Sequence, residues 1–246
     1  MSSNSLPAAK PFVLVHGAWG GAWIWRRIVG ALRHAGHEVH AVTLTGDGER
    51  AHLRHPGIDL HAHIADVTGL VRAEELREIV LVGHSYGGMV ITGAADRLLA
   101  TDPDSVRALV YVDAMVPLPG EGWGDAHAPE IVAARRAAAA AHDNALPPPD
   151  PGDFGLSGND RDWLLRRQVL HPFGAYRQAL HFDGDRLARL PRTFIDCTAP
   201  AYPTIDAMRQ RVRQMPGFRV VEMKTGHCPM VSAPQELLRH LLDAAP

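Results

Sequence analysis

One pentapeptide, set between an apolar run and a helix-like segment, restricts the fold of this chain most strongly. Ile79 to Val82 are apolar, and Gly83-His84-Ser85-Tyr86-Gly87 follows them directly. The pattern G-x-S-x-G at a strand-to-helix turn is typical of a nucleophile elbow, where a serine sits in a strained conformation at the tip. Small residues are needed two positions before and after that serine, because the two backbones nearly touch there. The sequence therefore predicts a strand over 78–82, a helix over 88–99 and Ser85 as a nucleophile between them.

Short apolar runs alternate with longer amphipathic segments along the rest of the chain, which is the βαβ pattern of a parallel sheet. A length of 246 residues fits one domain of this class. We expect a single α/β domain over residues 1–246, with a mostly parallel sheet and flanking helices. Further strands are expected at 12–16, 39–44, 108–113, 193–197 and 219–223, and helices near 23–35, 61–76, 204–214 and 234–243.

The segment from about residue 117 to 190 interrupts this alternation. It contains an Ala-rich stretch with helical character at 129–142, a Pro-rich stretch at 147–151 and a further helical pattern at 163–169. Long structureless loops are rare inside compact domains and usually carry function. We predict a helical cap inserted between two strands and covering the site. The alternative is a surface insertion without a role.

The net charge and the cysteine content limit which binding partners and which cellular compartment we expect. A formal net charge of −2 gives no electrostatic reason to bind nucleic acid or an anionic membrane. No apolar run approaches the ~20 residues that span a bilayer, and Met1 to Lys10 lacks the apolar core of a signal peptide. Cys197 and Cys228 are expected to be free thiols in a reducing compartment. We expect a cytoplasmic protein acting on a small molecule, with monomer and homodimer both left open.

A serine hydroxyl is a weak nucleophile at its ordinary pKa and needs a general base. In the chain order Ser…acid…His, the base follows the last strand. Gly226-His227-Cys228-Pro229 comes directly after the strand expected at 219–223. A lone histidine in a loop is usually inert, but this one stands where the chain order requires a base. We predict that His227 is the general base.

These motifs resemble the α/β-hydrolase superfamily and, within it, the compact esterases grouped with plant methyl-ester hydrolases and hydroxynitrile lyases. The resemblance rests on Val13-Leu14-Val15-His16-Gly17-Ala18-Trp19, on the elbow and on the His227 loop. It implies an oxyanion hole formed by the backbone N–H groups of Ala18 and Tyr86, with His16 bracing the turn. We take Trp19 and Met115 as candidate residues of the substrate pocket.

Two positions distinguish the chemistries of the proteins that this chain resembles. The lyases carry Thr where Gly17 stands and Lys where Cys228 stands, so cyanohydrin cleavage is not expected. Dehalogenases and epoxide hydrolases of this fold attack with Asp, which Ser85 excludes. Cleavage of a carboxylic ester through an acyl-enzyme remains. A binding or receptor-like protein with vestigial hydrolysis is the alternative from another class.

The acid of the catalytic triad is missing from its usual place in such proteins, the loop after the second-to-last strand. Residues 198–203 contain no carboxylate. Asp196 lies inside the expected strand and Asp206 in the expected helix that follows. Asp113 ends the strand after the elbow helix, a position from which some hydrolases of this fold draw their acid. We predict Asp113 as the acid, against the alternative that it only begins a turn.

The sequence gives no pattern for a metal or a cofactor. It contains neither H-E-x-x-H nor C-x-x-C. His61 and His63 stand two residues apart and do not share a helix face. Gly46-Asp47-Gly48 lacks the dinucleotide-binding fingerprint and is expected to form a turn. We expect neither metal nor cofactor, and we expect Cys228 to be a packed side chain rather than a thiol nucleophile.

Overall fold

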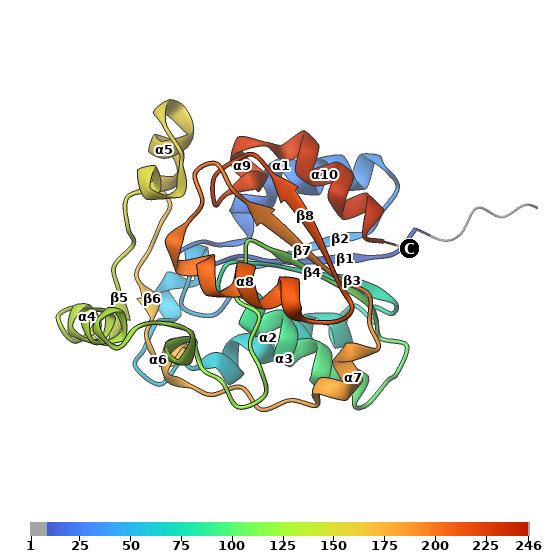
Figure 1. The fold of residues 1–246 in the computed structure, drawn as a ribbon, viewed down its shortest axis with the longest axis horizontal. Helices are drawn as coiled ribbons and strands as arrows, with labels where there is room; N and C mark the ends of the chain where they lie inside the picture. Colours follow the sequence, from blue (N-terminus) through green and yellow to red (C-terminus); the bar gives the residue numbers. More distant parts are fainter. Residues whose placement is uncertain (1–8, 246) are drawn as a thin grey trace, which may run out of the picture.

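The computed structural model describes residues 9–245, which form a six-stranded, wholly parallel sheet between two layers of helices (Figure 1). This confirms the predicted α/β class. The prediction of no signal-peptide core concerns residues 1–10, of which 1–8 lie outside the described part. The strands, in spatial order, are β2 (Val39–Val42), β1 (Phe12–Val15), β3 (Ile79–His84), β4 (Val106–Val112), β7 (Arg192–Cys197) and β8 (Phe218–Met223).

The central strands are apolar on both faces because helices cover both faces. Every residue of β1 and β3 is buried, as expected for a parallel sheet inside an α/β fold. In Figure 1, α1 (Arg26–His34) and α10 (Pro234–Asp243) lie on one face. On the other face lie α2 (Leu60–Ala73), α3 (Gly87–Leu99) and α8 (Asp206–Gln214).

The chain direction across the sheet reverses between β1 and β3. The chain runs outward from β1 to β2 and then returns to place β3 on the other side of β1. In open parallel sheets, ligands bind beyond the carboxyl ends of the strands at such a reversal. The loop after β1 and the elbow after β3 meet there, so the topology itself brings these two motifs together.

Most of the insertion between β4 and β7 stands beside the carboxyl ends of the strands, but its last helix, α7 (Gly184–Ala188), lies toward their other ends (Figure 1). Its two-residue strands β5 (Ala145–Leu146) and β6 (His171–Pro172) pair antiparallel and are too short for a sequence pattern to reveal. Side chains of the insertion, among them Phe154 and Leu164, join the same apolar core as the sheet. The helices of the insertion are α4 (Pro129–Ala140), α5 (Gly158–Leu165), α6 (Gly174–Arg177) and α7 (Gly184–Ala188).

Two helix predictions need correction. The helix expected at 163–169 is α5, which begins at Gly158 and ends at Leu165. The chain leaves the helix because the Val169 N–H donates to the Trp19 carbonyl instead, at 3.1 Å. The helix expected at 23–35 is a 3₁₀ turn over Ala22–Trp25 followed by α1. No helix within residues 9–245 is long and apolar enough to cross a membrane.

Candidate active site

Ser85 occupies the strained turn that the elbow motif predicts. Its φ is +52°, in the left-handed region that a non-glycine residue adopts only when its surroundings impose it. The two flanking glycines permit the turn. A Cβ on Gly83 would lie 2.6 Å from the Gly87 carbonyl oxygen, and one on Gly87 would lie 2.7 Å from the His16 carbonyl oxygen. The packing therefore accepts no side chain at either position.

The loop after β1 lies against the nucleophile. A Cβ on Gly17 would lie 2.8 Å from the Ser85 Cβ. His16 holds this loop to the end of β2, because its Nδ1–H donates to the Gly17 carbonyl at 2.6 Å and its Nε2 accepts from the Leu44 N–H at 3.0 Å. Burial lowers the pKa of His16, which favours the neutral ring that both bonds require. His16 therefore braces the turn, as expected.

The two backbone N–H groups expected to form the oxyanion hole flank the nucleophile. Ala18 follows Gly17 and lines the same cavity as Ser85. Tyr86 follows Ser85 and precedes the first residue of α3. Within residues 9–245 neither N–H donates to a protein acceptor. Both donors are thus available to a ligand oxygen near Ser85.

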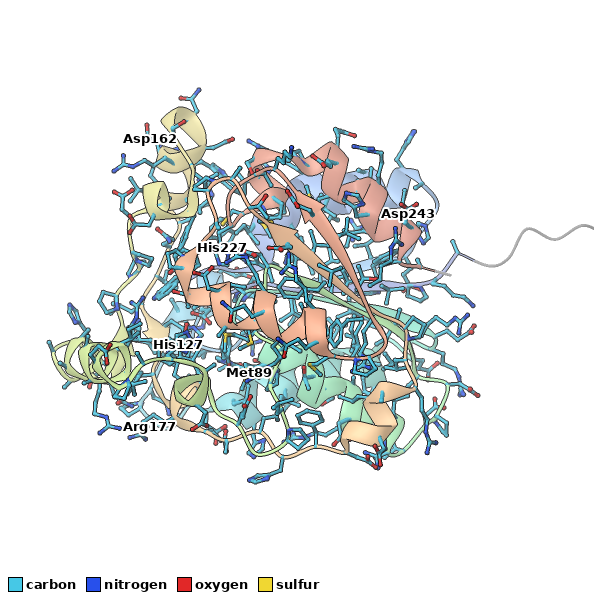
Figure 2. All side chains as sticks on the ribbon, viewed as in Figure 1. Met89, His127, Asp162, Arg177, His227 and Asp243 are labelled. Carbon is cyan, nitrogen blue, oxygen red and sulfur yellow. The ribbon has the colours of Figure 1, made fainter. Side chains whose placement is uncertain are left out.

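His227 and Asp113 are in direct contact, although 114 residues separate them in the sequence. The His227 Nδ1–H donates to Asp113 Oδ2 at 2.7 Å, and both side chains are buried. Asp113 follows β4 and His227 follows β8, so the carboxyl ends of these strands carry both residues. Figure 2 shows His227 toward the end of the sheet that faces the insertion, far from Asp243 at the end of α10. With Nδ1 bound to Asp113, the lone pair of the neutral ring lies on Nε2.

The third contact of a triad, between Ser85 and His227, is not made in the described chain. Both side chains line one cavity, but no hydrogen bond joins the Ser85 hydroxyl to His227. In ligand-free sites such bonds are often long and tighten only around a substrate. The arrangement therefore brings Ser85, His227 and Asp113 to one place and leaves His227 Nε2 without a protein partner.

His84 and the insertion hold the His227 loop. The His84 Nε2–H donates to the His227 carbonyl at 2.8 Å, and the two ring centroids lie 4.6 Å apart. Burial and the neighbouring His227 hold the pKa of His84 well below its ordinary value, so this ring is neutral. The His227 N–H donates to the carbonyl of Phe154, a residue of the insertion, at 3.0 Å. The base is thus fixed from both the sheet and the insertion.

The other two candidate acids contact an arginine that the sequence did not reveal. Arg209 Nε donates to Asp196 Oδ1, and Nη1 donates to Asp206 Oδ1, each at 2.7 Å. Arg209 Nη2 donates to Asp113 Oδ1, also at 2.7 Å. Neither Asp196 nor Asp206 contacts His227. Arg209 lies in a strongly polar helix, and only the i,i+3 spacing to Asp206 hints at a pair, so its burial at 9% side-chain exposure could not be read from the sequence.

The cavity at Ser85 is small and mostly apolar. Its volume of about 20 Å³ is close to the space of a single water molecule. Trp19 lines it, with its Nε1–H donating to the Leu146 carbonyl of the insertion at 3.0 Å. Met115 is not among the lining residues; its N–H donates to the Ser85 carbonyl at 3.0 Å. The insertion contributes Phe154, Leu164 and Gln168 to the wall.

A second buried Asp–His pair ties the insertion to the core. Asp47, after β2, accepts from the His171 Nδ1–H of β6 at 2.9 Å, and both side chains are fully buried. His171 Nε2 has no partner in the described chain. Burial raises the pKa of Asp47 to about 7 and lowers that of His171 to about 3. Among residues 9–245, no three His, Cys, Asp or Glu side chains are grouped so as to hold a metal ion.

Comparison with known proteins agrees with this geometry. Residues 12–240 match the family model of the alpha/beta hydrolase family. The chain is 40% identical over 239 residues to a carbendazim hydrolyzing esterase of Nocardioides sp. (strain SG-4G), covering 94% of this chain and 97% of that protein. It is 26% identical to polyneuridine aldehyde esterase of Rauvolfia serpentina, over 98% of each chain. A solved extracellular alpha/beta-hydrolase from a Paenibacillus species has a TM-score of 0.83 at 21% identity, covering 96% of this chain and 98% of that chain. The chain belongs to the alpha/beta hydrolase family.

Proposed function

We propose that this protein is a serine esterase that cleaves carboxylic esters through an acyl-enzyme intermediate. The observation that carries the proposal is the convergence of a serine in an elbow conformation and the 2.7 Å His227–Asp113 pair on one cavity. Esterase names among the relatives support it. These include a protein that shares 40% of its residues with this chain.

The proposed reaction has two halves. Ser85 Oγ attacks the ester carbonyl carbon while His227 Nε2 accepts the hydroxyl proton, and Asp113 stabilises the resulting imidazolium. The N–H groups of Ala18 and Tyr86 bind the oxyanion. His227 then gives the proton to the departing alcohol, which leaves an acyl group on Ser85. A water molecule then attacks that acyl group while His227 accepts one of its protons, and His227 returns this proton to Ser85 Oγ as the carboxylic acid leaves.

We propose a small to medium, largely apolar ester as the substrate, bound under residues 117–190 acting as a cap. Aromatic and aliphatic side chains line the cavity, among them Trp19, Phe154 and Leu164. Because its volume is only about 20 Å³, entry of an ester requires the side chains of the insertion to move. Phe154, Leu164 and Gln168 are the lining residues from that segment.

The observations at Gly17 and Cys228 do not favour the lyase alternative. A Cβ at position 17 would meet Ser85 at 2.8 Å, so the threonine of the lyases would not fit here. Cys228 is 1% exposed, and burial raises the pKa of its thiol, so it supplies no cation and no thiolate. The receptor-like alternative has no observation of its own, because nucleophile, base and oxyanion donors are all present.

A fluorophosphonate probe tests the proposal, because it phosphonylates only an activated serine. We expect the probe to label the wild type and not Ser85→Ala. Hydrolysis of p-nitrophenyl esters of graded chain length, and of carbendazim, should fall about 10³-fold or more in that variant. Ser157→Ala removes an exposed serine and is the matched control. Near wild-type turnover or labelling in Ser85→Ala would overturn the proposal.

We also propose a reducing, cytoplasmic location. Cys197 and Cys228 are both free and buried, and free thiols are typical of reducing compartments. Fractionation of the native cells tests this placement. Recovery of the protein mainly outside the cytoplasm would contradict it.

A further inference from the structure

The Arg209 guanidinium is held on three sides by acceptors that fix its plane. Besides its bonds to Asp196, Asp206 and Asp113, it donates to the carbonyls of Tyr202 at 2.9 Å and Cys197 at 3.1 Å. A buried arginine with its donors satisfied in this way is rigid and permanently charged. One of its fixed N–H groups reaches the carboxylate that contacts His227.

We propose that Arg209 is a positioning residue of the triad, which keeps Asp113 ionised and turns its Oδ2 toward His227. The inference rests on the proposed function. It adds a fourth side chain to the site, acting on the base only through the acid. Arg209 comes from α8, the helix after β7, so the region of the chain that usually supplies the acid supplies a cation here.

Burial makes such a cation necessary. Asp113 is fully buried, and a carboxylate without a nearby positive charge in such a place becomes protonated. A protonated Asp113 would stabilise the imidazolium of His227 poorly. Arg209 Nη2 binds Oδ1 and His227 Nδ1 binds Oδ2, each at 2.7 Å. Each oxygen therefore has its own charged or polar partner, and the carboxylate cannot rotate without losing one of them.

The same charge makes the Asp113–His227 pair take up a proton less readily, so removal of Arg209 should move the active range of the enzyme to higher pH. The other titratable groups around the pair are His84 from β3, Cys197 and Asp196 from β7, Tyr202 after β7 and Cys228. His84 is neutral, and burial raises the pKa of both thiols. Arg209 is thus the cation in direct contact with Asp113.

Activity measured against pH separates this role from a structural one. We expect Arg209→Met to lower kcat on a p-nitrophenyl ester about 10²-fold and to move the acidic limb of kcat/KM upward by about one pH unit. Arg209→Lys keeps the charge but loses the planar fork. Its acidic limb should stay within a few tenths of a pH unit of the wild-type limb, and its kcat should fall less than that of Arg209→Met. An unmoved limb in Arg209→Met, or equal shifts in both variants, overturns the proposal.

Arg213→Met is the matched control. Arg213 binds the other oxygen of Asp196 and is half-exposed, but it does not touch Asp113. We expect its kcat and its acidic limb to stay at wild-type values, while circular dichroism reports folding of every variant. A loss equal to that of Arg209→Met would show that the whole charged cluster, rather than Arg209, matters. If Arg209→Met fails to fold, Arg209→Gln and Arg209→Lys give the same comparison of limbs.

A double variant tests whether Arg209 acts through Asp113. In an Asp113→Asn background, Arg209→Met should lower kcat by less than about threefold, because the step that it supports is already lost. A full, multiplicative loss overturns the proposal. Fluorophosphonate labelling distinguishes a failure of the proposed esterase function from a failure of the role proposed for Arg209. Failure of the wild type to label at Ser85 defeats the proposed function, whereas labelling with unchanged limbs defeats only the role of Arg209.

Discussion

The molecule contains two buried Asp–His pairs of nearly equal geometry and different surroundings. Asp113 and His227 meet at 2.7 Å, and Asp47 and His171 meet at 2.9 Å, with Nδ1 facing the carboxylate in both. In the first pair Arg209 binds the second carboxylate oxygen, and His227 lines the Ser85 cavity. In the second, both carboxylate oxygens face the His171 ring, and its Nε2 is buried without a partner.

The difference teaches that an Asp–His contact alone does not mark a catalytic dyad. What distinguishes the first pair is a bound cation and a histidine that lines the same cavity as Ser85. The second pair joins the loop after β2 to strand β6 of the insertion, and we interpret it as a structural link. The two pairs should therefore differ in what their loss does to activity and to stability.

The largest expected effect is on kcat when the acid is removed. Asp113→Asn should keep the shape of the site but leave the imidazole wrongly oriented, lowering kcat roughly 10²- to 10⁴-fold. Asp47→Asn should lower it far less, as should Asp206→Asn and Asp196→Asn. The measurement is kcat for the four variants, with folding checked by circular dichroism. If Asp206→Asn loses most of its kcat while Asp113→Asn keeps nearly all of it, the assignment of Asp113 as the acid is wrong.

The second prediction concerns stability, for which the Asp47–His171 pair should matter more than the Asp113–His227 pair. His171→Ala leaves the Asp47 carboxyl buried without its hydrogen-bond partner, so we expect the free energy of unfolding in urea to fall by about 2 kcal/mol. His227→Ala leaves Asp113 bound to Arg209 and should cost less. Adding Asp47→Asn to His171→Ala should recover part of the loss. Equal losses of unfolding free energy in His171→Ala and His227→Ala would show that Arg209 does not compensate Asp113 for the loss of His227.

The third prediction uses the opposite pKa shifts of Asp47 and His171. Burial raises the pKa of Asp47 to about 7, so its contribution to stability is lost as the pH rises from about 4 to 7. Burial lowers the pKa of His171 to about 3, so its contribution is lost as the pH falls from about 6.5 to 3. Between about pH 4 and 6.5, the two slopes cancel, because the pair holds one proton in both the folded and the unfolded state.

Asp47→Asn removes one of these slopes. The variant should therefore lose stability relative to the wild type as the pH falls from 6.5 toward 4, by up to about 1.4 kcal/mol per pH unit. Urea unfolding of both proteins at pH 6.5, 5.5 and 4.5 measures the difference. Asp185→Asn, at an exposed position, should show no such trend. A constant difference between Asp47→Asn and wild type would mean that His171 is protonated in the folded protein.

The smallest expected effect is that of a chelator. If both pairs act without a metal, exhaustive treatment with EDTA should leave ester hydrolysis and thermal stability unchanged. Activity that is lost on chelation and restored by zinc or manganese would show that one of the two Asp–His pairs takes part in binding a metal.

Much of the sheet and the elbow could be predicted because the decisive information is local. Four apolar residues followed by G-x-S-x-G specify β3, the turn and α3 with no knowledge of the rest of the chain. The order of strands also places the ends of β4 and β8 on one edge, which is why a contact between Asp113 and His227 could be anticipated. The elbow motif and the strand order are therefore enough to predict that Asp113 and His227 lie near Ser85.

The missed features depend on contacts between distant segments. Asp47 and His171 are 124 residues apart, and each looks like an ordinary turn or loop residue by itself. Arg209 resembles the other arginines of α8 until the packing of β7 against β4 brings Asp196 and Asp113 to it. The end of α5 at Leu165 is not predictable from the pattern of 163–169, because Val169 gives its N–H to Trp19 in a tertiary contact.

The bond from the His227 N–H to the Phe154 carbonyl couples access to chemistry. Phe154 also lines the cavity, so an opening that shifted its backbone would release the carbonyl that holds the His227 loop. In that case substrate would enter while His227 is loosely held and would react only after the loop is held again. We therefore expect a substitution that weakens this contact to speed the exchange of substrate and product and to slow the chemical step.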